Sequence, residues 1–251
     1  MEEAIEKMLH GFRSFRDTYF SGDSELFDQL KHGQHPRSLI IACSDSRVDP
    51  ALITESDPGD LFVIRNVANL VPPYEPDTRH HGVSAALEYA VNGLQVEHII
   101  IIGHSDCGGI HALMERTPEK PAGEFLDAWL DLAEPAKQAA MVLSNASPHT
   151  RHRACEEASL VLGLENLLTL PWIKARVDAG KLALHAWYFH IAAGRLFGYD
   201  RAKGGFTEFH PSLHLSQSED HPRRTRRAAF RAGAGKTGKP RRPHGNRPPA
   251  A

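Results

Sequence analysis

The sequence predicts an α/β fold in which a mostly parallel central β-sheet is flanked by helices. Three short apolar runs, at residues 38–43, 61–65 and 98–103, are separated by polar and helical patterns. None of the runs alternates between apolar and polar residues, which is typical of parallel strands covered on both faces. A helical pattern over residues 82–93 separates the second run from the third, and this strand–helix–strand order indicates the α/β class.

The first 30 residues are expected to form a helical arm. Six apolar residues recur there at roughly helical spacing, with charged residues between them: Ile5, Met8, Leu9, Phe12, Phe15 and Phe20. A face so rich in aromatic residues packs on something large. From the residues alone, a partner subunit and the core of the same chain are equally suitable.

Further helices and strands are expected after the third strand. Helices are predicted over 123–140 and 154–179, with Pro135 and Pro171 as boundaries. One more strand is predicted over 181–189, and a turn then leads to a pairing strand at 195–199.

The last part of the chain, residues 211–251, is predicted to be a basic and disordered tail behind a folded domain of residues 1–210. Ten Arg and Lys residues and no Asp or Glu occur from Pro222 onward, although the whole chain has a net charge of -2. Such a tail can neutralise phosphates, but Phe230 is its one aromatic residue and no recognition motif is visible. No specific nucleic-acid partner is therefore expected.

The composition also indicates the cellular compartment of the protein. No run of 18 apolar residues occurs, so no membrane partner is expected. The charged start of the chain lacks the features of a secretory signal or a transit peptide. The three cysteines, Cys43, Cys107 and Cys155, are an odd and low number that fits a reducing compartment. A cytoplasmic location is the resulting prediction.

Two of the cysteines and one histidine form a candidate metal site. Cys43 ends the first predicted strand, and His104 and Cys107 follow the third. Because the carboxyl ends of parallel strands meet at one edge of a sheet, these side chains can lie together. Two thiolates and an imidazole suit Zn²⁺ and leave its fourth position open, as in catalytic zinc sites. On the residues alone, a buried structural cysteine and a histidine bonded to backbone remain alternatives.

Several segments resemble the signature of the β-class carbonic anhydrases. The paired motifs are Cys43-Ser44-Asp45-Ser46-Arg47 and Gly103-His104-Ser105-Asp106-Cys107-Gly108-Gly109, with two linking segments, 58–69 and 84–91, in the expected order. The similarity runs from about Gly11 to Tyr199, and the segment 67–74 resembles a plant-type subgroup. The resemblance implies a zinc lyase that hydrates CO2 reversibly to bicarbonate and a proton by zinc-bound hydroxide. A zinc hydrolase of the same scaffold, acting on carbon disulfide or carbonyl sulfide, is the alternative.

The resemblance assigns roles by matching position. Cys43, His104 and Cys107 would bind one Zn²⁺ per subunit. Asp45 and Arg47 would form a catalytic dyad, in which the Arg-held carboxylate accepts the proton of the zinc-bound oxygen and directs its lone pair at CO2. Asp45 is also a possible fourth zinc ligand in a closed state at low pH.

The substrate pocket implied by the resemblance contains polar and apolar residues. Its members are Gln34, the wall formed by Phe62, Val67 and Tyr89, and the backbone N–H of Gly108 for bicarbonate. The family builds this pocket across a dimer interface, so a homodimer or a higher even oligomer is implied, with the N-terminal helical arm packing on the partner subunit.

Two positions depart from the family pattern. A regulatory bicarbonate site requires Trp where this chain has Ile40, so such regulation is not expected. Some plant members carry a histidine where this chain has Gly93, so the proton shuttle is unassigned, with His80 and His81 as candidates because imidazole titrates near neutrality. Cys155 matches no ligand and is interpreted as structural.

Overall fold

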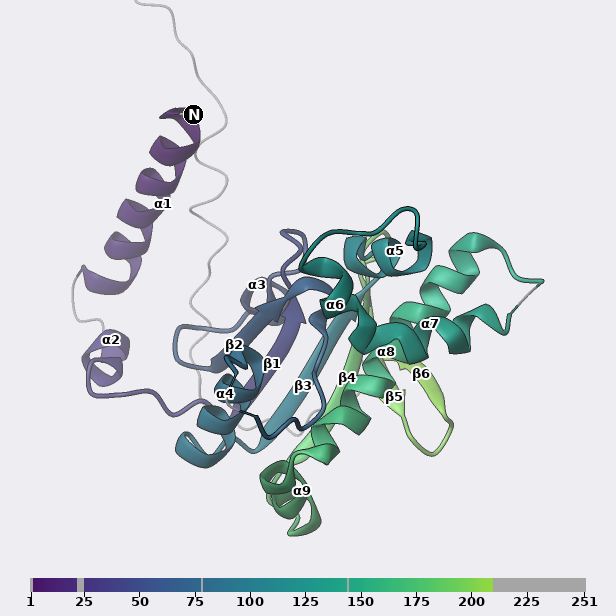
Figure 1. Cartoon of the computed structure of the whole chain (residues 1–251). Helices are drawn as coiled ribbons and strands as arrows, with labels where there is room; N and C mark the ends of the chain where they lie inside the picture. Colours follow the sequence, from purple (N-terminus) through teal and green to yellow (C-terminus); the bar gives the residue numbers. More distant parts are fainter. Residues whose placement is uncertain (1, 22–24, 78, 144, 210–251) are drawn as a thin grey trace, which may run out of the picture. The chain divides into compact units, whose positions relative to one another are not determined.

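The computed structural model describes residues 2–21, 25–77, 79–143 and 145–209. Within this part a six-stranded sheet has the strand order β2-β1-β3-β4-β5-β6 (Figure 1). The strands are β1 (Ser38–Cys43), β2 (Leu61–Asn66), β3 (His98–His104), β4 (Ala183–His190), β5 (Arg195–Asp200) and β6 (Gly205–Glu208). Strands β2, β1, β3 and β4 are parallel to one another, whereas β5 pairs antiparallel with β4 and β6 antiparallel with β5. The predicted mostly parallel α/β sheet is confirmed, whereas the predicted tail lies outside the described residues.

Helices flank the sheet, and several differ in extent from the prediction. They are α1 (Glu2–Phe20), α2 (Glu25–Leu30), α3 (Pro50–Thr54), α4 (Gly82–Glu88), α5 (Gly108–Glu115), α6 (Leu126–Leu130), α7 (Glu134–Met141), α8 (Pro148–Thr169) and α9 (Pro171–Asp178). A π-helical turn, Tyr89–Gly93, extends α4, and 3-10 turns occupy Val67–Asn69 and Asp131–Ala133. No described helix is both long and apolar enough to cross a bilayer.

The main differences from the prediction have local causes. The arm consists of two helices, α1 and α2. Helix α8 begins six residues before the predicted Ala154, because Ser147 caps the backbone N–H of Thr150 and Pro148 fits the first turn. That first turn is polar, so hydrophobic periodicity did not reveal it. Strand β6 was not predicted, since its four residues are too few for a period to be visible.

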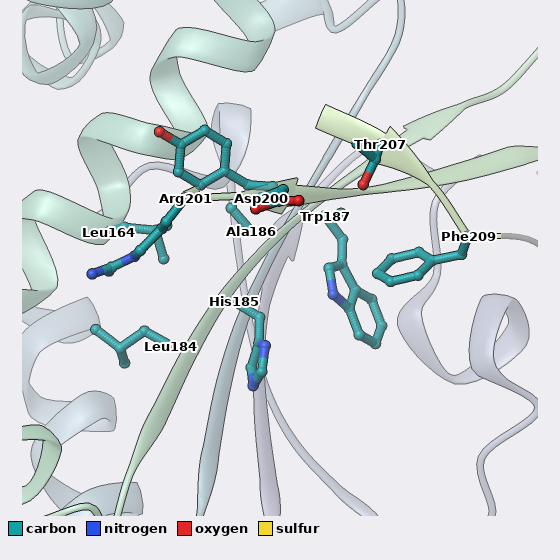
Figure 2. A pocket seen from close by; sticks show the side chains of 11 residues that line it. Leu164, Leu184, His185, Ala186, Trp187, Asp200, Arg201, Thr207 and Phe209 are labelled. Atoms are coloured by element: carbon teal, nitrogen blue, oxygen red, sulfur yellow. The ribbon is translucent and has the colours of Figure 1, made fainter. Parts of the chain in front are cut away.

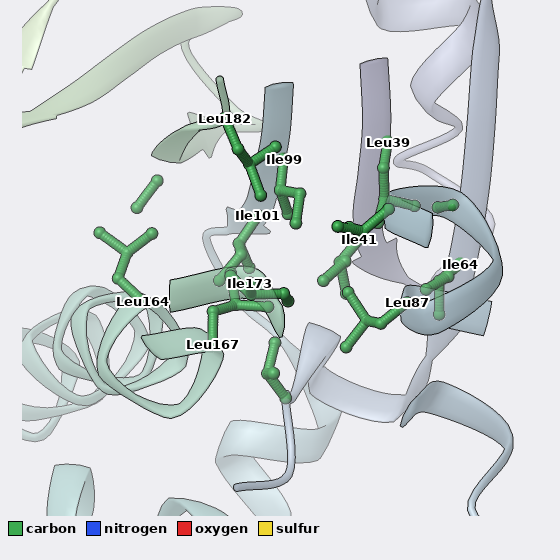
Figure 3. Packing of buried hydrophobic residues seen from close by; sticks show 14 of the residues in the cluster. Leu39, Ile41, Ile64, Leu87, Ile99, Ile101, Leu164, Leu167, Ile173 and Leu182 are labelled. Carbon is green, nitrogen blue, oxygen red and sulfur yellow. The ribbon is translucent and has the colours of Figure 1, made fainter. Parts of the chain in front are cut away.

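The two faces of β1 and β3 are both buried, which explains their continuous apolar runs. One face packs against α4, α8 and α9 in a cluster that includes Leu39, Ile41, Ile99 and Ile101 (Figure 3). The intervening residues form a second cluster on the other face with Leu61 and Trp187. Helix α8 approaches β3 closely, because a Cβ placed on Gly163 would lie 2.8 Å from Cδ1 of Ile101.

Strand register brings the chemically interesting residues to one edge. Strand β1 pairs in parallel with both β2 and β3, and Ala42 lies opposite Ile102. The residues that follow these positions, Cys43 on β1 and His104 at the end of β3, therefore emerge at the same carboxyl edge of the sheet.

Candidate metal centre

Cys43, His104 and Cys107 converge at the carboxyl edge of the sheet. One ligand atom from each lies within 4.8 Å of the others, and all three residues are buried. The two sulfur atoms are 4.0 Å apart. Two Zn–S bonds of about 2.3 Å at a tetrahedral angle place their sulfurs ~3.8 Å apart, so the observed separation suits that ion.

The turn between His104 and Cys107 directs both side chains to one point. Asp106 has φ 56° in this turn, a left-handed conformation that Asp tolerates better than most residues. The Nδ1 atom of His104 lies 2.9 Å from the carbonyl oxygen of Ser105, to which it can donate. The Nε2 atom is then left as a lone-pair donor, and it is buried without a hydrogen-bond partner among the described residues. An unpaired buried nitrogen facing two sulfurs is the arrangement that a metal ion satisfies.

Cys43 is held in a setting that favours its thiolate. Its pKa falls to about 4, chiefly because the thiol of Cys107 donates to it, and the backbone N–H groups of Asp45 and Ala68 lower it further. Ala68 adopts φ 62°, which is unfavourable for a residue with a Cβ. The strained backbone at Ala68 thus supplies a hydrogen bond to a proposed ligand.

Cys107 stands at the N-cap position of α5. The pKa of its thiol rises, mainly because this group is the donor to Cys43 and also because it is buried. The backbone N–H groups of Ile110 and Gly109 act in the opposite direction and lower that pKa. The amides of the first helical turn therefore point at the sulfur and would stabilise a thiolate once a cation replaces the shared proton. The donor set fits Zn²⁺.

Asp45 and Arg47 form a bidentate ion pair beside these residues. Nε and one terminal nitrogen of Arg47 donate to the two carboxylate oxygens, at 3.0 and 2.7 Å, and the backbone N–H of Arg47 donates at 2.9 Å. Arg47 holds the pKa of Asp45 well below its usual range. The same guanidinium donates to the carbonyl of Asp106 at 3.1 Å, which ties the dyad to the turn before Cys107.

Arg65 is a residue of this site to which the sequence interpretation gave no structural role. It extends from β2 and donates to the carbonyls of Cys43 and Asp45, at 3.0 and 2.7 Å, while its third contact is an ion pair with Asp49. Contacts to backbone carbonyls cannot be recognised in a sequence, because every residue carries a carbonyl. The one available signal was an arginine at the end of an otherwise apolar strand.

Glu156 and Tyr188 were also missed. The backbone N–H of Cys107 donates to one carboxylate oxygen of Glu156 at 3.0 Å, and the hydroxyl of Tyr188 donates to the other at 2.8 Å. Burial raises the pKa of Glu156, and the two donors oppose that rise. Both residues also line a cavity of about 240 Å³ with His111 and His152. No motif marked them, because they lie 49 and 81 positions from Cys107.

The residues expected to line the substrate pocket are only partly brought together in the protomer. The rings of Phe62 and Tyr89 lie 5.8 Å apart. Val67 lies against the start of α5, since a Cβ on Gly109 would be 2.8 Å from its Cγ1. Tyr89 is 54% and Val67 39% exposed, which is high for a pocket wall.

Two polar members of the expected pocket lie on the surface of the protomer. Gln34 is exposed in the segment between α2 and β1, and Gly108 is exposed as the first residue of α5. Of the shuttle candidates, His80 is exposed, whereas His81 contacts Asp77 through Nε2 at 2.6 Å.

A larger cavity of about 420 Å³ lies beside β4 and β5 (Figure 2). His185, Trp187, Asp200 and Phe209 are among its lining residues. It contains none of the residues that the resemblance assigns to metal or substrate. The candidate chemistry therefore lies at the carboxyl edge of β1 and β3 rather than in the more spacious hollow.

Comparison with known proteins identifies similar chains. Residues 38–196 match the family model described as carbonic anhydrase. A carbonic anhydrase of Synechocystis sp. is 39% identical over 86% of this chain and 78% of that protein. A carbonic anhydrase of Pseudomonas aeruginosa is 39% identical over 83% of this chain and 94% of its own length.

Solved structures agree with the sequence relatives. The structure of the β-carbonic anhydrase CcaA has a TM-score of 0.76 and 38% identity, covering 82% of this chain and all of that one. One of two tetrameric β-carbonic anhydrases of Sordaria macrospora has a TM-score of 0.71 and 29% identity, covering 82% of this chain and 99% of its own.

Proposed function

Because the chain belongs to the β class of the carbonic anhydrases, an enzyme family, we propose that it interconverts CO2 and bicarbonate with one Zn²⁺ per subunit. The observation that supports this most is the buried group of Cys43, His104 and Cys107, in which Nε2 of the histidine has no hydrogen-bond partner within the described part of the chain. These three residues would hold the ion. When bound, Zn²⁺ supplies a Lewis acid that lowers the pKa of a coordinated water to about 7.

The dyad positions the reacting water in this proposal. Oδ1 of Asp45 accepts from both Nε and the backbone N–H of Arg47, whereas Oδ2 accepts from one guanidinium nitrogen and keeps a second lone pair. Asp45 therefore stays ionised and accepts a hydrogen bond from the water, so that an oxygen lone pair faces CO2. Arg47 keeps the carboxylate away from the ligand group. A closed state, in which Asp45 leaves Arg47 and takes the fourth position at low pH, stays a prediction.

We further propose that Phe62, Val67 and Tyr89 admit CO2 and that Gln34 and the N–H of Gly108 hold bicarbonate. An apolar wall suits a nonpolar gas, and a few donors suit an anion. The wall is half open in the single protomer, which favours a pocket completed by a second subunit. A homodimer or a higher even oligomer follows, with the arm of residues 1–30 packing on the partner. A cytoplasmic location stays a prediction as well.

Stopped-flow CO2 hydration by the zinc-loaded protein tests the activity. Hydration that rises between pH 6 and 9 is expected, because a coordinated water ionises near pH 7. Parallel assays with carbon disulfide and carbonyl sulfide test the alternative, which gains no support from the reported relatives. A folded, zinc-loaded sample that hydrolyses either compound but does not hydrate CO2 would show the assignment to be wrong.

A further inference from the structure

We infer that Glu156 and Tyr188 form a positioning pair that fixes the direction in which Cys107 presents its sulfur to the metal. The inference rests on the proposed zinc centre and goes beyond the ligands and the Asp45–Arg47 dyad. Neither member of the pair contacts substrate in this proposal. Both act through the backbone of Cys107.

The contact geometry is specific. Glu156 comes from α8, Tyr188 from β4, and Cys107 from the turn between β3 and α5. The carboxylate of Glu156 accepts from the Cys107 amide with one oxygen and from the Tyr188 hydroxyl with the other. Glu156 is 4% and Tyr188 1% exposed, so both side chains are buried. Three separate elements thus meet on one carboxylate.

The carboxylate of Glu156 holds Cys107 at its backbone amide, and Tyr188 holds that carboxylate. The carboxylate holds the amide nitrogen of Cys107, while the amides of Gly109 and Ile110 act on the sulfur. A cysteine held at both its amide and its sulfur has little freedom to rotate about the bond between Cα and Cβ. Tyr188 then prevents rotation of the carboxylate, because its hydroxyl occupies the second oxygen. Outer hydrogen bonds of this kind orient the ligands of metal sites.

Tyr188 is itself held in place. The guanidinium of Arg153 lies over its ring, 5.5 Å from the centroid, and Nε of Arg153 donates to Glu157 at 2.9 Å. Glu157 therefore supports Tyr188 through Arg153 and is not a neutral position. Glu165, an exposed glutamate of the same helix, provides the matched position for substitution.

The test compares zinc release from the zinc-loaded full chain into a chromogenic chelator. Glu156→Ala is expected to release zinc about 10- to 100-fold faster than the unaltered protein. Glu156→Gln keeps an acceptor for the Cys107 amide and should stay within about threefold, and Tyr188→Phe should fall between the two. Glu165→Ala, the control, should release zinc at the unaltered rate. Circular dichroism at the same temperature verifies that each variant is folded.

A spectroscopic readout separates positioning from a merely structural role. In the cobalt-substituted protein, the sulfur-to-metal charge-transfer band should shift in Glu156→Ala and Tyr188→Phe, but not in Glu165→Ala. Equal release rates and equal spectra for Glu156→Ala and Glu165→Ala would overturn the inference. So would a Glu156→Gln variant that releases zinc as fast as Glu156→Ala. An unaltered protein that binds no zinc would instead overturn the proposed centre itself.

Discussion

The sulfur atoms of Cys43 and Cys107 lie 4.0 Å apart although 64 positions separate the two residues in the chain. Cys43 ends β1, and Cys107 follows the neighbouring parallel strand β3. The separation is close to that of two sulfurs on one tetrahedral zinc. The pairing of β1 with β3 and the turn at Asp106 together bring the sulfurs to ligand distance.

Removing one of these sulfurs should remove the metal. Cys107→Ala is expected to purify with less than about a tenth of the zinc of the unaltered protein, because two remaining ligands bind zinc far more weakly than three. Zinc per subunit, measured by plasma mass spectrometry, tests this. Cys155→Ala is the matched control, since Cys155 is also a buried free cysteine but lies in α8 outside the ligand group. Full zinc content in Cys107→Ala would contradict the assignment.

Loss of Arg47 should impair turnover without loss of zinc. Arg47→Ala removes both side-chain donors to Asp45, so the carboxylate can rotate towards the metal centre. We expect kcat to fall about 10- to 100-fold, as for other outer-sphere partners of metal sites, while zinc content stays unchanged. Stopped-flow hydration rates and metal analysis on the same sample decide the matter. Unchanged kcat would show that the ion pair has no part in the reaction.

Much of this site could be predicted because its residues follow apolar strands. The runs that became β1, β2 and β3 are buried on both faces, so they are continuous in the sequence, and their shared carboxyl edge follows from parallel order. The contacts of Arg65 and Glu156 could not be predicted. Their partners are the carbonyl of Cys43 and the amide of Cys107, and every residue except proline carries both groups.

The pair His98 and His185 should make the protein less stable in mild acid. Nδ1 of His98 lies 3.3 Å from Nε2 of His185 across β3 and β4, and burial, followed by repulsion from His98, lowers the pKa of His185. A histidine whose pKa is lower in the folded state binds protons more readily when unfolded. The stability that the neutral His185 contributes is therefore lost as the pH falls through the pKa of histidine in the unfolded chain, which is about 6.5.

Thermal unfolding at pH 7.5 and 5.5 measures this loss. Replacing His185 by Gln should reduce the decrease in Tm between the two pH values, whereas His35→Gln, at an exposed position, should leave it unchanged. An equal decrease in the unaltered protein and in His185→Gln would show that this pair does not contribute.

The apolar face of α1 should mediate assembly. Met8 and Phe12 are 69% and 59% exposed in the protomer, as the proposed packing on a partner requires. Phe12→Glu places a charge in that face and should lower the mass of the particle measured by light scattering. Arg13→Glu, the next residue of the same helix, should leave the mass unchanged. Identical masses for both variants would mean that α1 does not hold subunits together.

The start of α5 should tolerate no side chain at Gly109. A Cβ there would lie 2.8 Å from Cγ1 of Val67 and 2.9 Å from Cβ of Ala68, and Ala68 already carries an unfavourable φ. Gly109→Ala should therefore lower the free energy of unfolding by about 1–3 kcal/mol, the range for overpacked positions. Urea denaturation measures the change, and Gly82→Ala is the control because no atom of the residues that the structure describes lies within 4 Å of its Cβ at the start of α4. The backbone N–H of Ala68 donates a hydrogen bond to Cys43. Displacement of the segment Val67–Asn69 should therefore also weaken zinc binding. A Gly109→Ala protein as stable as Gly82→Ala would mean that the segment Val67–Asn69 moves freely and does not constrain the metal centre.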